Sequence, residues 1–304
     1  MDDYDLIIIG GGPAGITAGI YATRKAIKTL LLTKDFVGQI GKTTEVENWP
    51  GEKSITGMDL EKKFKEHLQE YEIDIKDGQE VVKIEKDGQG FSIITKKEKF
   101  SAKSVIIASG RTPRKLGIEG EEEFSGKGVS YCVICDGPFF KDKQVAVIGG
   151  GNAGIETALE LSKYTKKVFI IEQEKNLLAD EFLQNKAKEA DNIEVHTNKQ
   201  VEKIEGKIMV EKLVCSDKET NKEIQLNVSG VFIEIGSVPA GEYLKDIVEF
   251  SELSEVKVNP ETCETSTSGL FAVGDVNNKK WKQIVTAVAD GARAGLAVYE
   301  YLNK

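Results

Sequence analysis

The spacing of apolar and polar positions predicts a strand, a turn and a helix at the start of the chain. Residues 6–9 form a short apolar run rich in β-branched side chains, which is typical of a buried parallel strand. The pattern G-x-G-x-x-G follows at positions 10–15, and residues 16–24 read as a helix. Glycines in this context let the backbone approach a pyrophosphate, and the helix N-terminus supplies N–H donors. The segment therefore predicts dinucleotide binding; the alternative is a glycine-rich turn without a ligand.

The same pattern recurs in the middle of the chain. Residues 144–148 predict a buried strand, a second G-x-G-x-x-G occupies positions 149–154, and residues 155–164 predict its helix. The next apolar run, 168–171, ends at Glu172. This carboxylate follows the fingerprint by about 20 residues, the position that holds the ribose 2′-hydroxyl in NAD sites. The alternative is that Glu172 only caps a strand.

The first unit lacks a carboxylate at the equivalent position. Its second strand is predicted at residues 29–33 and is followed by Lys34 and Asp35, which leaves the ribose contact of this unit open. The polar, turn-rich residues that come next, 38–39 and 43–51, can offer amide and hydroxyl groups to a flat heteroaromatic ring. Without the neighbouring fingerprint they would read as an ordinary surface loop.

Other elements are predicted between the two fingerprints and at the end of the chain. Residues 57–71 predict an amphipathic helix, and residues 79–107 alternate in the manner of an antiparallel sheet. The apolar residues 105–110 return to a buried strand. Residues 269–275 predict a strand that closes on Gly-Asp, before a helix of small residues at 285–301. An aspartate at that strand end can bond a ribose or ribityl hydroxyl, so the last segment completes the first unit.

These elements predict an α/β fold with two Rossmann-like dinucleotide-binding domains, the second inserted into the first. A length of 304 residues agrees with two domains of about 150 residues each. The first domain is expected to comprise residues 1–113 and 244–304, and the second residues 114–243. Breaks at residues 111–115 and 239–241 mark the two crossings, which together form a hinge that allows rotation.

The composition excludes several classes of protein. A net charge of −9 and a pI of about 5.1 disfavour nucleic acid, because phosphate neutralisation requires a basic surface. No apolar run approaches the about 18 residues needed to cross a bilayer, and the acidic start does not resemble a signal peptide. Four cysteines are too few for a secreted disulfide scaffold, so a cytoplasmic protein is expected.

The most reactive stretch of the chain holds two cysteines, Cys132 and Cys135, followed by Asp136 and a glycine. Thiols at this spacing can close and reopen a small disulfide ring, and the carboxyl group can move the proton that thiolate chemistry requires. The same spacing is half of a zinc site. However, Cys215, Cys263 and the two histidines provide no second ligand pair, so no metal is expected.

Taken together, the motifs resemble the low-molecular-weight thioredoxin reductase family of pyridine nucleotide-disulfide oxidoreductases. The matching pieces, in family order over essentially the whole length, are Gly-Gly-Gly-Pro-Ala-Gly, Thr-Thr-Glu-Val-Glu-Asn-Trp-Pro-Gly, Cys-x-x-Cys-Asp-Gly, Gly-Gly-Gly-Asn-Ala-Gly and Phe-Ala-Val-Gly-Asp. The resemblance implies FAD in the discontinuous domain and a pyridine nucleotide in the inserted domain. It also implies a homodimer and a rotating inserted domain.

The resemblance also implies roles for single residues. Cys132 and Cys135 are the redox pair, with Cys135 facing the flavin and Cys132 attacking the partner. Asp136 is the proton donor, and a simple Asp-Gly turn is the alternative. The residues expected at FAD are Gly10, Gly12, Pro13, Ala14, Gly15, Gln39, Asn48, Val82, Gly274, Asp275, Gln283 and Ile284. Those expected at the nicotinamide nucleotide are Gly149, Gly151, Asn152, Ala153, Gly154 and Glu172.

The sequence departs from the family pattern in one place. Members that use NADPH carry His-Arg-Arg where this chain has Glu172-Gln-Glu, a stretch closer to the flavoprotein component of alkyl hydroperoxide reductase. The carboxylates of Glu172 and Glu174 would repel a 2′-phosphate, so NADH is the expected donor and NADPH the weaker one.

The sequence therefore predicts an FAD-dependent thioredoxin reductase that acts on a thioredoxin- or glutaredoxin-like protein, with no nucleic-acid or membrane partner. Three alternatives stay open. A ferredoxin-linked or nicotinamide-independent reductase would have a vestigial second fingerprint. A flavin redox sensor would bind the cofactors without turnover, and a zinc-stapled module would use the cysteines as ligands.

Overall fold

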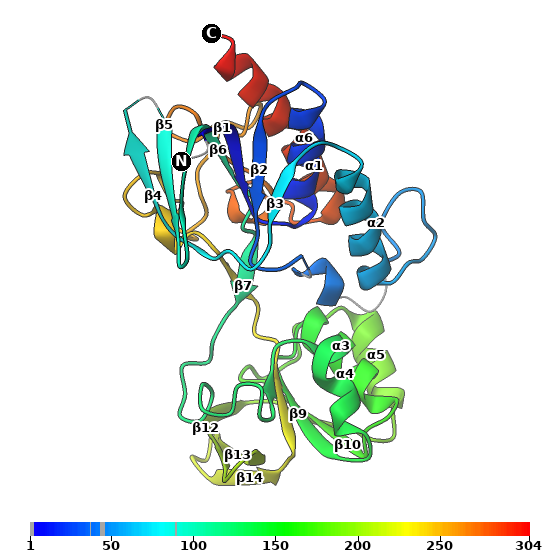
Figure 1. Cartoon of the computed structure of the whole chain (residues 1–304). Helices are drawn as coiled ribbons and strands as arrows, with labels where there is room; N and C mark the ends of the chain where they lie inside the picture. Colours follow the sequence, from blue (N-terminus) through cyan, green and yellow to red (C-terminus); the bar gives the residue numbers. More distant parts are fainter. Residues whose placement is uncertain (1–2, 37, 43–45, 89) are drawn as a thin grey trace. The chain divides into compact units, whose positions relative to one another are not determined.

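The computed structural model describes residues 3–36, 38–42, 46–88 and 90–304, and the chain divides into two compact units (Figure 1). The first unit comprises Met1–Thr112 and Val238–Lys304, and the second comprises Pro113–Ser237. The predicted α/β fold with one Rossmann-like unit inserted into another is confirmed. Residues 43–45 of the predicted ring-binding loop lie outside the described residues.

The chain returns to the first unit at Val238, earlier than the boundary expected at residue 244. Backbone pairing explains the difference. The N–H of Ala240 donates to the carbonyl of Gly110 at 3.0 Å, and Ser109 Oγ donates to the carbonyl of Ala240 at 2.6 Å. Leu244 is fully buried in a core cluster of the first unit. The residues after the return are thus already part of the first unit.

The two crossings are short strands, β7 (Arg111–Pro113) and β16 (Ser237–Pro239), which pair with each other. Pro113 falls in the second unit, one residue before the expected boundary. Arg111 Nη1 lies 3.2 Å from Glu255 Oε1, and both side chains are largely buried. This ion pair fixes the start of the outgoing strand to the first unit.

A seven-stranded sheet forms the centre of the first unit, in the order β3-β2-β1-β6-β5-β4 with β17 paired to β6. Strands β1, β2, β3, β6 and β17 are parallel, and Ile7 of β1 lies between Leu30 of β2 and Val105 of β6. Buried apolar side chains on both faces suit a sheet covered on both sides. The strands are β1 (Asp3–Ile9), β2 (Thr29–Leu32), β3 (Asp74–Lys76), β4 (Val81–Asp87), β5 (Gly90–Thr95), β6 (Lys99–Ile107) and β17 (Leu270–Ala272).

One strand takes the place of two in the prediction. The alternating segment up to residue 107 and the apolar strand from residue 105 are both part of β6. One edge of β6 pairs parallel with β1. The other edge pairs antiparallel with β5 in its first half and parallel with β17 in its second half. The antiparallel strands therefore extend the main sheet and do not form a separate one.

In the described part of the first unit, the α-helices are α1 (Pro13–Thr23), α2 (Gly57–Gln69) and α6 (Ile284–Leu302). The side chain of Thr56 caps α2 by accepting a hydrogen bond from the N–H of Asp59 at 3.1 Å. Helices α1 and α6 lie side by side (Figure 1). They approach closely because a Cβ on Gly291 would come within 2.2 Å of the carbonyl oxygen of Ala14.

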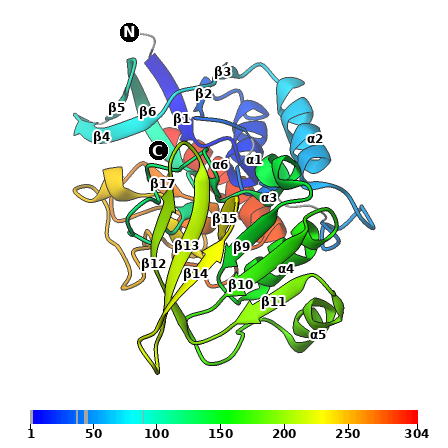
Figure 2. The ribbon, with the colours of Figure 1, turned by 90° about the horizontal axis from the view of Figure 1, so that it is seen from below.

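The second unit has a parallel five-stranded sheet in the order β11-β10-β9-β15-β8, with α4 and α5 beside it (Figure 2). Its strands are β8 (Val129–Ser130), β9 (Gln144–Ile148), β10 (Lys167–Ile171), β11 (Ile193–His196) and β15 (Gly230–Ile233). Its α-helices are α3 (Val133–Asp136), α4 (Asn152–Ser162) and α5 (Glu181–Glu189).

An antiparallel three-stranded sheet packs against the same core, formed by β12 (Lys199–Gly206), β13 (Val210–Asp217) and β14 (Glu223–Asn227). The described residues also form short 3₁₀ helices, η1 (Ile40–Lys42), η2 (Gly137–Phe140), η3 (Glu242–Leu244) and η4 (Gly274–Val276). Within the described ranges, every helix is too short or too polar to span a membrane.

Candidate functional site

The first fingerprint forms a tight turn between β1 and α1. Gly10 adopts φ +118°, and a Cβ there would lie 2.2 Å from the carbonyl oxygen of Ala108, so only glycine fits. An ideal Cβ on Gly12 meets nothing within 4 Å. The first intrahelical bond runs from the N–H of Ile16 to the carbonyl of Gly12 at 2.9 Å. The N–H groups of the first helical turn therefore remain for an anion placed over Gly12.

A threonine stands where a Rossmann unit usually has its ribose carboxylate. The N–H of Gly11 donates to Thr33 Oγ1 at 3.1 Å, and the same hydroxyl donates to the carbonyl of Asp35 at 2.5 Å. The sequence analysis assigned no role to Thr33. The signal was its position 22 residues after Gly11, which is the separation of Gly150 and Glu172 in the second unit.

In the C-terminal segment, Gly274 and Asp275 lie next to the first fingerprint. A Cβ on Gly274 would lie 3.0 Å from the Cβ of Ala14, so the strand end of β17 adjoins the start of α1. Burial raises the pKa of the Asp275 carboxyl, while Lys282 and Arg111 oppose this shift. Within the described residues, the carboxyl group of Asp275 makes no hydrogen bond. Its oxygens can therefore accept hydrogen bonds from hydroxyl groups of a ligand.

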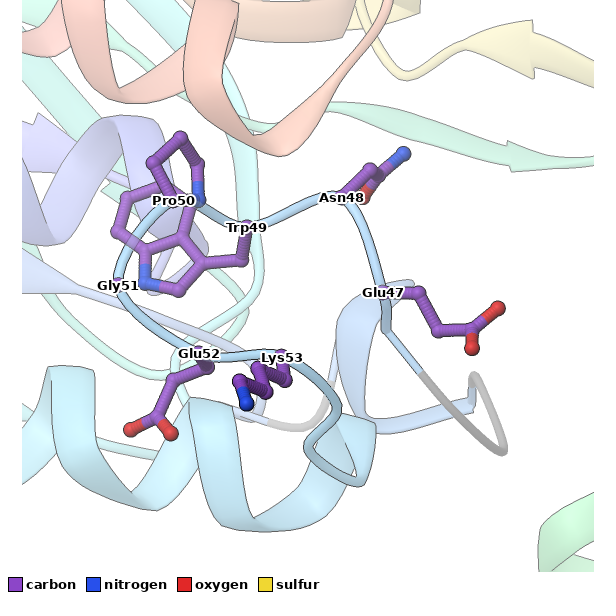
Figure 3. Close-up of a pocket in the computed structure, with 7 residues that line it drawn as sticks. All are labelled: Glu47, Asn48, Trp49, Pro50, Gly51, Glu52 and Lys53. Atoms are coloured by element: carbon purple, nitrogen blue, oxygen red, sulfur yellow. The ribbon is translucent and has the colours of Figure 1, made fainter.

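The loop at residues 47–53 reaches the start of α6. The amide of Asn48 donates to Gln283 Oε1 at 3.1 Å, and Gln39 Nε2 donates to the carbonyl of Arg111 at 3.3 Å. Figure 3 shows this loop curling around a shallow pocket, with Asn48 pointing away from the rings of Trp49 and Pro50.

For two other residues predicted at FAD, Ile284 and Val82, the contacts do not by themselves indicate a flavin site. Ile284 packs against a small apolar cluster with Ile40, Val46 and Leu60. Val82 lies on β4 with 42% of its surface exposed, in the antiparallel part of the sheet. The structure brings the other predicted residues of this unit to the ends of β1, β17 and α6, and Val82 stays a prediction.

The second fingerprint repeats the first in geometry. Gly149 has φ +117°, and its Cβ would lie 2.3 Å from the carbonyl oxygen of Glu234. Gly151 faces open space, and the first helical bond runs from the N–H of Ile155 to Gly151 at 3.0 Å. Helix α4 therefore also leaves N–H groups at its start, including those of Ala153 and Gly154.

Glu172 lies at the end of β10, as predicted, and is 95% buried, with both carboxylate oxygens bonded to the backbone. Oε2 accepts from the N–H of Gly150 at 2.6 Å, and Oε1 accepts from the N–H of Glu174 at 2.8 Å. A carboxylate has about four acceptor positions, so a ribose hydroxyl can still be accommodated. The two backbone hydrogen bonds of Glu172 would also be expected if the residue only stabilised the end of the strand.

Asn152, at the first position of α4, is engaged with Asp180. Its Nδ2 donates to Asp180 Oδ2 at 2.9 Å, and its Oδ1 accepts from the N–H of Asp180 at 2.8 Å. The nearby Glu156 carboxyl has its pKa raised, by burial first and then by Asp180. The Asn152–Asp180 pair holds the start of α5 against the second fingerprint.

The two cysteines of the redox motif form a disulfide at the start of α3, with an S–S distance of 2.11 Å. Cys132 is the N-cap of the helix, and its sulfur accepts from the N–H of Cys135 at 3.2 Å. Cys132 is buried, whereas Cys135 is exposed. In this oxidised form Cys135 is therefore the redox cysteine that solvent reaches.

Asp136 is held by Ser130, a residue that the sequence analysis missed. Ser130 Oγ lies 2.6 Å from Asp136 Oδ2 and accepts from the N–H of Cys132 at 3.0 Å. No spacing rule links a serine to an acid six positions later, so only the fold reveals this contact.

The other cysteines, Cys215 and Cys263, are free and buried. Burial raises the pKa of the Cys215 thiol to about 12, and burial followed by Asp290 raises the pKa of Cys263. Among the described residues, the acidic, histidine and cysteine side chains form no cluster of three or more suited to a metal ion.

The comparisons with known proteins agree with this geometry. The family model of the pyridine nucleotide-disulphide oxidoreductases matches residues 4–291. The chain belongs to this family. It is also similar to solved thioredoxin reductases from Lactococcus lactis (37% identity, TM-score 0.91, 99% of each chain) and T. acidophilum (38%, 0.90, 100% of each chain). The resemblance to low-molecular-weight thioredoxin reductases is thereby confirmed.

Curated relatives are longer than this chain. A Bacillus subtilis protein named NADH dehydrogenase is 38% identical over 99% of this chain and 59% of its own length. A component of the alkyl hydroperoxide reductase of Staphylococcus aureus is 36% identical, over 99% of this chain and 59% of its own length. The chain thus spans about three fifths of these relatives.

The pyridine nucleotide-disulphide oxidoreductase family implies FAD and a pyridine nucleotide, and the residues present fit both. The first unit offers open space over Gly12, free N–H groups at α1 and the unbonded carboxyl of Asp275. The second unit offers the same cradle over Gly151 and a buried carboxylate at Glu172.

Proposed function

We propose that this family member is an FAD-dependent disulfide reductase that passes two electrons from a nicotinamide through Cys132 and Cys135 to a thioredoxin-like protein. The net reaction is NADH + H⁺ + protein disulfide → NAD⁺ + protein dithiol. The observation that carries the proposal is the closed Cys132–Cys135 disulfide, with a carboxyl group on the same short helix. Bound FAD and nicotinamide would supply the two electrons that open this disulfide.

The residues of the chain perform the remaining tasks. The helix start at Gly12 and the carboxyl of Asp275 hold the flavin nucleotide. Asp136 gives a proton to a departing sulfur and takes one from an attacking sulfur. Attack by Cys132 on the partner, as the family resemblance implies, requires its buried sulfur to become accessible after reduction. Rotation of the second unit at the β7 and β16 crossings is the proposed means.

We propose NADH as the preferred donor. Glu172 and Glu174 present carboxylates at the end of β10, where a 2′-phosphate would lie. Two lysines of this region are paired, Lys199 with Asp217 at 2.7 Å and Lys175 with Glu219 at 3.2 Å, while Lys218 Nζ donates to the carbonyl of Gln173 at 3.1 Å. A 2′-phosphate would therefore meet two carboxylates at the end of β10, with Lys218 as a cation held nearby by a backbone carbonyl.

One observation favours a second candidate, a reductase that takes electrons from ferredoxin. Glu172 and Asn152 already have their polar atoms bonded within the second unit. A nucleotide site that has lost its ligand could retain such internal bonds for structural reasons. Stopped-flow absorbance of the flavin after mixing with NADH, NADPH or reduced ferredoxin separates these donors. The fastest bleaching is expected with NADH.

A variant tests the disulfide relay itself. Cys135→Ser should abolish reduction of a thioredoxin while the purified protein retains its flavin. A colourless protein that binds no added FAD would refute the flavin assignment, and persistent thioredoxin reduction by Cys135→Ser would refute the relay.

We also propose a homodimer that uses the exposed faces of α1 and α6. Tyr21, Leu296 and Tyr299 on these helices are 40%, 42% and 38% exposed, so the two adjacent helices offer several large apolar side chains to a partner. Light scattering should give twice the chain mass, and Leu296→Glu should give a monomer. A monomeric wild type would refute the proposal.

A further inference from the structure

Ser130 links the disulfide to the carboxyl group that is proposed to serve it. It is the last residue of β8 and is 96% buried. Its Oγ accepts from the N–H of Cys132 at 3.0 Å and lies 2.6 Å from Asp136 Oδ2. The carbonyl oxygen of Cys132 is 3.2 Å from the same Oγ. The hydroxyl is thus placed between the backbone of one redox cysteine and the carboxyl group.

The Ser130 hydroxyl can form a hydrogen bond with the Asp136 carboxyl group in both of its protonation states. It has one donor and two acceptor positions, one of which the N–H of Cys132 uses. When Asp136 is ionised, Ser130 donates to it, and 2.6 Å is typical of such a charge-assisted bond. When Asp136 is protonated, its own O–H donates to Ser130, whose hydrogen then turns toward the carbonyl of Cys132. The carboxyl group keeps one partner throughout.

Two other ionisable groups near α3, Glu160 and Tyr164, are poorly suited to replace Asp136 as a carrier of protons. Helix α4, which packs against α3, carries Glu156 and Glu160, and Glu160 is paired with Lys163 at 2.7 Å. Tyr164 lies against Gly137, and burial followed by the charge of Glu160 raises its pKa to about 12. The phenol stays protonated near neutral pH and cannot exchange a proton as a carboxyl group does.

We propose that Ser130 is a positioning residue that holds the Asp136 carboxyl beside the disulfide through each change of its protonation. This inference rests on the proposed disulfide reductase function and adds to it the group that fixes the acid. Ser130 acts through Asp136 and does not itself touch the reacting sulfur atoms.

The proton balance of the exchange shows why both states matter. The Cys132 thiolate attacks one sulfur of the partner, forming a mixed disulfide and breaking the partner's S–S bond. The released partner thiolate takes the proton of Asp136. The carboxylate then takes the proton of the Cys135 thiol, whose thiolate attacks the sulfur of Cys132. The second partner thiolate leaves and takes that proton, so the partner gains two electrons and two protons, and the pair returns to a disulfide.

The test uses full-length, flavin-loaded protein whose cysteine pair is first reduced and then freed of excess reductant. It is mixed in a stopped-flow instrument with bis(2-hydroxyethyl) disulfide, whose alkyl thiolate needs a proton to leave. Ser130→Ala should slow this reaction by about tenfold, as expected when a hydrogen bond to a charged group is lost. Ser130→Thr, which keeps the hydroxyl, should restore the rate to within about twofold of wild type.

Two further measurements distinguish a loss of Asp136 positioning from a general loss of structure in Ser130→Ala. An aromatic disulfide such as 5,5′-dithiobis(2-nitrobenzoate) releases a stable thiolate that needs no proton, so Ser130→Ala should leave its rate nearly unchanged. Asp136→Ala should slow the alkyl disulfide reaction, and adding Ser130→Ala to it should cause no further loss. Equal slowing with both disulfides, or losses that multiply in the double variant, would overturn the inference.

Wild type provides the control for the underlying function. If the pre-reduced wild type reduces neither disulfide, the proposed function fails and the role of Ser130 fails with it. If wild type is active and Ser130→Ala matches it with the alkyl disulfide, only the role of Ser130 is refuted.

Discussion

The side-chain amide of Asn48 donates a hydrogen bond to Gln283 Oε1 at 3.1 Å, although the two residues are 235 positions apart. Gln283 is the N-cap of α6 and forms a capping box with Thr286. The bond therefore joins the loop after the first fingerprint to the helix that the C-terminal segment contributes. Two residues that the family resemblance placed at FAD are brought together without any ligand.

This bond predicts coupled effects on flavin affinity. Asn48→Ala and Gln283→Ala should each weaken FAD binding by about fivefold, equivalent to about 1 kcal/mol for one hydrogen bond. The double variant should lose less than the product of the two, because each single change already breaks the shared bond. Quenching of flavin fluorescence by the apoprotein measures the dissociation constants. Gln225→Ala in the second unit is the matched control, and independent losses would contradict the coupling.

The two redox cysteines differ in exposure, and substitutions can separate their roles. The resemblance assigns the attack to Cys132, whereas Cys135 is the exposed residue in the oxidised form. If Cys132 attacks, Cys135→Ser should trap a stable mixed disulfide with a thioredoxin-like protein, because no second thiol remains to resolve it. Non-reducing electrophoresis detects the adduct. An adduct formed only by Cys132→Ser would reverse the assignment.

The sequence predicted the secondary-structure elements that neighbouring residues in the chain determine. Gly10 and Gly149 were recognisable because their turns tolerate no Cβ, and the two apolar runs after them form the predicted neighbouring strands. The course of β6 was not predictable in the same way, because along one edge its partner changes from the antiparallel β5 to the parallel β17. Such pairing depends on residues far away in the chain.

Side-chain partners within the site were also beyond the reach of the sequence. The position of Glu172 was predicted from spacing, but its two backbone donors were not. Ser130 was missed because a hydroxyl acts through its local geometry and has no sequence pattern of its own. Thr33 was missed although its distance from Gly11 along the chain equals that between Gly150 and Glu172. The boundary near residue 238 was missed because strand pairing with residue 110 decides it.

The proposed preference for NADH should be alterable at one exposed position. Glu174 contributes only its N–H to the anchor of Glu172, so Glu174→Arg keeps that anchor and adds a cation beside the ribose. A charged contact to a 2′-phosphate is worth about 1.5–3 kcal/mol, so the ratio of NADPH to NADH efficiency should rise at least about tenfold. Steady-state kcat/KM for both nucleotides measures this. Glu174→Gln is the matched control, and an unchanged ratio would argue against nucleotide binding at this edge.

The two free cysteines should be inert in the folded protein. Cys215 and Cys263 are 1% and 0% exposed, and burial raises the pKa of both thiols, to about 12 for Cys215. After reduction, a thiol reagent at pH 8 should therefore titrate two thiols per native chain and four after unfolding. Cys215→Ser should leave the number of thiols titrated in the native chain unchanged and lower only the number titrated after unfolding. Rapid reaction of a third thiol in the native protein would contradict this.

Glu61 on α2 should make stability depend on pH. Burial raises the pKa of its carboxyl group, with Lys65 opposing, and Oε1 is buried without a hydrogen-bond partner in the described part of the chain. A carboxyl group whose pKa is higher in the folded than in the unfolded state favours folding while it is protonated. That contribution is fully present below the unfolded pKa and is lost as pH rises through the folded pKa.

Glu61→Gln removes this dependence because the amide does not titrate. The free energy of unfolding of the variant should therefore exceed that of wild type by about 1 kcal/mol near pH 8, with a smaller difference near pH 4. Urea unfolding of the flavin-loaded proteins at the two pH values provides the comparison. Glu66→Gln on the same helix is the control, because Glu66 is exposed and pairs with Lys62 at 3.8 Å, an interaction of little weight. A difference that is constant with pH would show that the carboxyl group of Glu61 is ionised equally in both states.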